Sequence, residues 1–130
     1  MIIPLEPKEP SLYERVGGRS GIARLVKHFY ADVRQHNVIG PVFNERIHDW
    51  PEHLAKIEEF WSRVTGGPSD YFGNVPAKHL ELNLAPAHFA AWLGLWEANC
   101  VIYLPPAEAA EMIATARQIG RRLQGGSSLL

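Results

Sequence analysis

The feature that most constrains the fold is a helical rhythm of apolar residues that returns along most of the chain. From residue 22 to 33, apolar side chains recur every three or four positions with charged side chains between them, as in an amphipathic helix. Similar patterns predict helices that begin near Asp49, at Pro86 and at Glu108. No alternation of apolar and polar residues is long enough to indicate a strand. The sequence therefore predicts an all-α fold.

Glycine and proline indicate where the helices begin and end. Ser11 and Glu14 have the spacing of a capping box, so we expect a short helix over 11–16 that ends at Gly17-Gly18. The long amphipathic helix is then expected to start at Ser20. Only one or two turns are available to the first helix.

The connections between the other helices are expected to be irregular. Gly40-Pro41 predicts a break in the chain that leaves Val42 and Phe43 in a tight corner. The helix that begins near Asp49 should keep an inward apolar face as far as Val64. Residues 70–84 are rich in loop-forming types and support at most a short helix near 77–82.

The bulk composition describes a single soluble domain. The 130 residues are 46% hydrophobic and include four tryptophans, enough for one real core. We expect an extended tail at 1–10, the domain at 11–124 and a flexible tail at 125–130. The formal net charge of −1 offers no basic surface for nucleic acid or an anionic membrane, so neither is an expected partner.

Two further observations concern the cellular setting. The first ten residues lack the basic start and apolar stretch of a secretory signal, so we expect a cytoplasmic protein. The most apolar segment, 89–104, is interrupted by Glu97 and Asn99 and indicates a buried helix rather than a membrane span. Cys100 is the single cysteine, and it can form neither an internal disulfide nor a paired thioether attachment.

A histidine in the irregular stretch is the first candidate for chemistry. His79 has apolar neighbours, and imidazole is a common ligand of haem iron. Taken alone, it could equally be a surface histidine or a core histidine with a satisfied ring. Tyr30, on the apolar face of the first long helix, could likewise be a core tyrosine whose hydroxyl bonds to the backbone.

The order and spacing of several motifs together are more specific. The chain carries, in sequence, Phe29-Tyr30, Gly40-Pro41-Val42-Phe43, His53 followed by Ile57 and Phe60-Trp61, Tyr71-x-Gly73, His79, and Phe89-x-x-Trp92. From Leu12 to Glu97 this resembles the truncated haemoglobins. The entry Asp49-Trp50-Pro51-Glu52-His53 is most similar to their third group, whereas Gly66-Gly67-Pro68 resembles the second.

This resemblance implies a globin-like two-over-two helical sandwich that binds haem b, with the proximal helix reduced to about a turn. By position, His79 is similar to the proximal iron ligand and Phe43 to the aromatic that packs on the haem. Tyr30, His53 and Trp92 match the distal residues around a bound ligand, and Ile57 lies one helical turn after His53. Further expected haem contacts are Lys56, Phe60, Trp61, Tyr71, Lys78 and Trp96.

The implied function is the binding of oxygen, nitric oxide or carbon monoxide. Several hydrogen-bond donors around the ligand predict slow oxygen release, which favours oxygen or nitric oxide chemistry, or peroxide activation, over transport. Turnover would need an external electron donor. The alternatives are an oxygen carrier or gas sensor without catalysis, and a haem-free helical interaction domain, which would leave the inward positions of Tyr30 and His53 unexplained.

Overall fold

The computed structural model describes residues 9–69 and 84–124. Every regular element in these ranges is a helix, which confirms the all-α prediction. The expected helix at 77–82 lies outside the described residues. The helices are α1 (Leu12–Arg15), α2 (Gly18–Gln35), α3 (Gly40–Arg46), α4 (Trp50–Val64), α6 (Pro86–Tyr103) and α7 (Pro106–Gln124).

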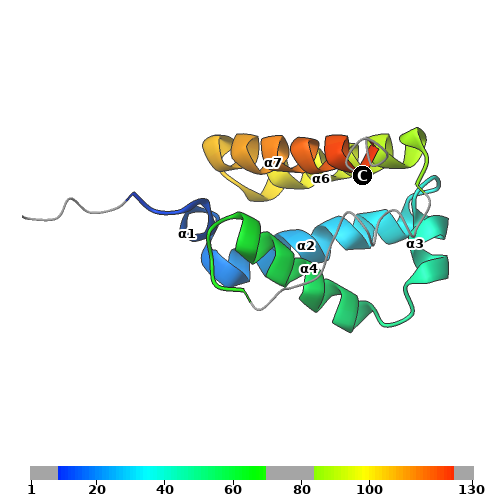
Figure 1. The fold of residues 1–130 in the computed structure, drawn as a ribbon, viewed down its shortest axis with the longest axis horizontal. Coiled ribbons are helices and arrows are strands. Elements are labelled where there is room, and N and C mark those ends of the chain that lie inside the picture. Colours follow the sequence, from blue (N-terminus) through cyan, green and yellow to red (C-terminus); the bar gives the residue numbers. More distant parts are fainter. Residues whose placement is uncertain (1–8, 70–83, 125–130) are drawn as a thin grey trace, which may run out of the picture.

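The long helices form two layers, with α2 and α4 in one and α6 and α7 in the other (Figure 1). Helix α2 contacts α4 within its own layer and α6 across the layers, and α3 packs against α2. The two-over-two arrangement expected from the resemblance is therefore present. One core lies between the layers.

The first turn of the chain follows its capping signal. The Ser11 hydroxyl accepts a hydrogen bond from the Glu14 backbone N–H at 3.2 Å, as the capping spacing predicts. Gly17 has φ of 101°, a left-handed conformation that glycine adopts without strain. Helix α2 starts at Gly18 rather than at Ser20, and Gly18 also has a positive φ, of 65°.

The corner expected at Val42 and Phe43 is wrong, because these residues lie in helix α3. Pro41 lies in the first turn of α3, where its missing N–H costs no intrahelical bond. Gly40 is needed for close approach, since a Cβ there would lie 2.9 Å from the carbonyl oxygen of Arg34. The Gly-Pro pair thus starts a helix against the end of α2.

Helix α4 begins as its sequence predicts and ends slightly differently. The Asp49 carboxylate accepts a hydrogen bond from the Glu52 N–H at 3.1 Å and caps the helix. Ile57 and Trp61 are buried, but Val64 is exposed, so the inward face ends before it. Thr65 is buried in its place, and its hydroxyl donates to the Trp61 carbonyl at 2.6 Å.

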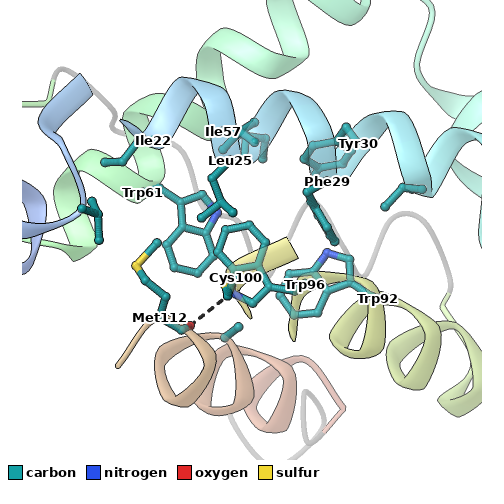
Figure 2. Packing of buried hydrophobic residues seen from close by; sticks show 14 of the residues in the cluster. Ile22, Leu25, Phe29, Tyr30, Ile57, Trp61, Trp92, Trp96, Cys100 and Met112 are labelled. Carbon is teal, nitrogen blue, oxygen red and sulfur yellow. Dashed lines mark hydrogen bonds between the residues drawn. The ribbon is translucent and has the colours of Figure 1, made fainter. Parts of the chain in front are cut away.

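Tryptophan side chains join the layers in the core (Figure 2). The indole of Trp96 stacks on that of Trp61 with centroids 4.4 Å apart, linking α6 to α4. The Trp96 N–H donates to the Met112 carbonyl of α7 at 3.2 Å. Phe29 of α2 meets Trp96 edge to face at 5.0 Å. The Trp96 side chain of α6 therefore contacts each of the three other long helices.

Candidate functional site

A cluster of aromatic rings from α2, α3 and α4 surrounds Tyr30. Tyr30 is 3% exposed, and its neighbour Phe29 meets it edge to face at 4.8 Å. Three further rings lie about it, from α3 and α4: Phe43 at 6.1 Å, Trp50 at 5.9 Å and His53 at 5.2 Å. The tyrosine hydroxyl is thus held on an inward face among rings from three helices.

Trp92 reaches this cluster from the other layer. It is 5% exposed on α6, and its ring lies 6.1 Å from that of Phe29. Burial raises the pKa of the Tyr30 hydroxyl above its usual value, and the nearby Trp92 side chain lowers that pKa by a smaller amount. Because the indole N–H of Trp92 can only donate, the tyrosine oxygen is the acceptor in any bond between the two. Tyr30 therefore stays protonated at neutral pH.

His53 contributes the imidazole of the cluster. It lies in the first turn of α4, partly buried, with its ring edge-on to Tyr30 and also to Trp50, whose centroid is 5.5 Å away. Ile57, one turn further on the same face, is 8% exposed. The structure thus places Tyr30, Phe43, Ile57 and Trp92 in one buried cluster, with the His53 ring against Tyr30.

The remaining predicted contacts divide into three groups. Trp61 and Trp96 are buried in the interlayer core, and Phe60 packs edge to face on Trp61 at 5.5 Å. The Lys56 side chain is 62% exposed and pairs with Glu52 at 3.0 Å on the outer face of α4. Tyr71, Lys78 and the expected iron ligand His79 lie outside the described residues.

Two residues at the cluster were missed as site residues. Trp50 lies three positions before His53 and shares its helix face, and Arg34 lies four positions after Tyr30 on α2. The Arg34 guanidinium lies over the Trp50 ring, 4.5 Å from its centroid. Helical spacing from Tyr30 and His53 was the signal that could have found both.

Within residues 9–69 and 84–124, no group of three or more histidine, cysteine or acidic side chains is placed to hold a metal ion. No helix of the described part is long and apolar enough to cross a membrane. The polar groups that the described part of the site offers are the protonated phenol of Tyr30, the imidazole of His53 and the indole of Trp92, all among aromatic rings.

The sequence profile of the bacterial-like globin family matches residues 11–113 of this chain, including every helix up to the middle of α7. The chain belongs to this family. This globin is 40% identical over 86 residues to a group 3 truncated hemoglobin of Campylobacter jejuni, an alignment that covers 62% of this chain and 68% of that protein.

Solved structures give the same result. The group III truncated hemoglobin of Campylobacter jejuni superposes with a TM-score of 0.78 at 34% identity, covering 83% of this chain and 89% of that one. The group II truncated hemoglobin of Bacillus anthracis has the same fold, with a TM-score of 0.81 at 24% identity, covering 90% and 92% of the two chains. These likenesses confirm the predicted resemblance to truncated haemoglobins. Membership implies haem-based gas binding.

Proposed function

We propose that this globin holds non-covalent haem b through His79 and binds a diatomic gas beside Tyr30, His53 and Trp92. The observation that carries the proposal is the gathering of these three polar side chains on inward faces of α2, α4 and α6. Haem b, rather than a thioether-linked haem, is supported by the single cysteine, which is buried on α6. A ferrous haem supplies an iron with one open position for oxygen, nitric oxide or carbon monoxide.

The donor set fits such a ligand. Other buried polar side chains in the described residues bond to protein groups; the Asn99 amide, for example, donates to the Leu95 carbonyl of its own helix at 2.8 Å and to Asp32 of α2 at 2.9 Å. Tyr30 instead points its hydroxyl into a ring of aromatic groups, where it can rotate to donate to a ligand while accepting from Trp92. One such bond in a dry pocket contributes about 1–3 kcal/mol when the ligand carries negative charge.

Slow release follows from this set and bears on the role. Oxygen becomes polarised on binding, so donors from Tyr30 and His53 would retard its departure much more than that of carbon monoxide. A protein that releases oxygen slowly is a poor shuttle, which favours oxygen or nitric oxide chemistry over transport. Forming nitrate from one oxygen and one nitric oxide consumes one electron, so turnover requires an external electron donor.

The test replaces Tyr30 by Phe, which keeps the ring and removes the hydroxyl. Oxygen dissociation, measured by stopped-flow displacement, should accelerate about tenfold or more, following about 1.4 kcal/mol per factor of ten, and carbon monoxide should respond much less. Tyr103→Phe is the matched control, because Tyr103 lies at the far end of α6 stacked on His28. Equal acceleration of both gases would indicate steric opening of the pocket, and no acceleration would remove Tyr30 from ligand binding.

Haem attachment is tested on the same preparations. Purified protein should show a haem absorption spectrum, and acid–ketone extraction should release the pigment. His79→Ala should lose most of it, whereas His48→Ala, at an exposed position, should keep it. Unchanged haem content and spectrum in the His79 variant would refute the proximal assignment. Rapid oxygen release with no nitrate formed on mixing with nitric oxide would favour the carrier role.

A further inference from the structure

A recess opens on the surface beside the aromatic cluster. It is lined by Ala31, Arg34 and Gln35 at the end of α2, by Asn44 of α3 and by Trp50 of α4. Ala31, Gln35 and Asn44 have no part in the proposed gas site, and Arg34 touches it only through the Trp50 ring. Trp50 belongs to both, because its ring faces Tyr30 and His53 inside the molecule.

Trp50 is therefore the wall between the recess and the interior. Its ring centroid lies 5.9 Å from that of Tyr30 and 5.5 Å from that of His53, which are distances of direct ring contact. Trp50 itself is only partly buried. The Trp50 side chain thus lies between the recess and the two polar groups that the proposed function assigns to ligand binding.

Arg34 holds this wall in position. Its guanidinium lies 4.5 Å from the Trp50 ring centroid, within the range of a cation–π contact. Among the described residues no carboxylate pairs with Arg34, so its charge is directed to the ring instead. The Asn44 amide donates to the Arg34 carbonyl at 3.0 Å and fixes the backbone beneath it.

We propose that the recess is the outer end of the route by which gases reach the interior, with Trp50 as its gate and Arg34 as the latch that keeps the gate closed. This inference rests on the proposed gas-binding function. Passage requires Trp50 to swing away from Tyr30 and His53, which breaks its contact with the Arg34 guanidinium. The gate acts before a ligand reaches the iron and becomes polarised there, so it retards oxygen and carbon monoxide alike.

The first experiment measures association rates of both gases after laser photolysis. Trp50→Leu should raise them about tenfold, by the same factor for oxygen and carbon monoxide. Arg34→Met keeps an aliphatic side chain, removes the charge and should raise both rates severalfold. Arg24→Met is the matched control, because Arg24 lies over the Tyr103 ring at 5.5 Å on the same helix. Unchanged rates in Arg34→Met, or an equal rise in Arg24→Met, overturn the proposal.

A double variant and a spectroscopic measurement complete the test. If Arg34 acts only through Trp50, adding Arg34→Met to Trp50→Leu should leave the association rates of the single Trp50 variant unchanged. A further rise of the rates in the double variant, by the factor seen for Arg34→Met alone, contradicts the role of Arg34 as latch. In protein labelled with 5-fluorotryptophan, Arg34→Met should shift the ¹⁹F resonance of Trp50, assigned with Trp50→Phe, and leave the other three in place. That readout needs no gas binding. If the purified protein contained no haem but the ¹⁹F resonance of Trp50 still shifted in Arg34→Met, the proposed function would be refuted while the contact between Arg34 and Trp50 would stand.

Discussion

The inward-facing polar side chains in the described part of this globin are of two kinds. Ser62 and Thr65 bond to nearby carbonyls at the end of α4, where they satisfy the backbone. Tyr30 and His53 face other rings instead. Sequence spacing predicted the inward positions of Tyr30 and His53, because four-residue periodicity fixes a helix face. The same spacing places Trp50 and Arg34 on the faces of His53 and Tyr30, but it does not by itself mark them as site residues, since an aromatic ring and a cation at helical spacing are usually core and solvated surface.

The buried thiol of Cys100 should lower the free energy of unfolding at alkaline pH. Its thiol is fully buried, and burial raises its pKa from 9.0 to about 12. Above about pH 9 the unfolded chain therefore loses a proton that the folded chain retains, so the free energy of unfolding falls as pH rises toward 12. Cys100→Ala should flatten this fall in urea titrations between pH 8 and about 11. An identical slope in both proteins would show that the buried thiol does not contribute.

The helices were predicted best where the apolar periodicity was long. They were predicted worst where one residue pair is compatible with either a break in the chain or the start of a helix. The segments now seen as α2, α6 and α7 follow their periodicity closely. Gly40-Pro41 reads as a break in sequence, but the same pair opens α3 because proline suits a first turn and glycine allows contact with Arg34. The contact between Gly40 and Arg34 depends on the path of α2, so the residues next to Gly40 in the sequence do not predict it.

The N-cap of α4 couples stability to the site. Asp49 caps the turn that carries both Trp50 and His53. Asp49→Ala should cost about 1 kcal/mol of stability and also change the association rates of both gases. Ser11→Ala removes the equivalent cap of α1, which carries no site residue, and should lower stability alone. Stability follows from urea unfolding and the rates from photolysis. Altered gas kinetics in the Ser11 variant would show that general loosening, not the first turn of α4, sets access.

At the scale of the whole molecule, the two layers share one core. Cross-layer contacts bring Phe29 of α2 and Trp61 of α4 onto Trp96 of α6, and an inter-helix hydrogen bond extends the set to α7. The aromatic content and the expected layers could be predicted from sequence, but the meeting of these rings depends on how the helices cross. The proposed gas site adjoins the same core, because Phe29 also contacts Tyr30 and Trp92.

This shared core predicts that the layers unfold together. Trp96 is fully buried, so Trp96→Ala removes contacts with every long helix and should cost about 3–5 kcal/mol, a large part of the about 5–15 kcal/mol that holds a domain folded. Ile102→Ala, 70% exposed on the same helix, should stay within about 0.5 kcal/mol. Urea unfolding followed by far-ultraviolet circular dichroism and by tryptophan fluorescence should give one coincident transition in each protein, shifted only for Trp96→Ala. If the two signals separated in that variant while its first transition stayed at the wild-type midpoint, one layer would be stable without Trp96. The core would then consist of two units in contact, and the proposed gas site between α2, α4 and α6 would depend on how they pack together.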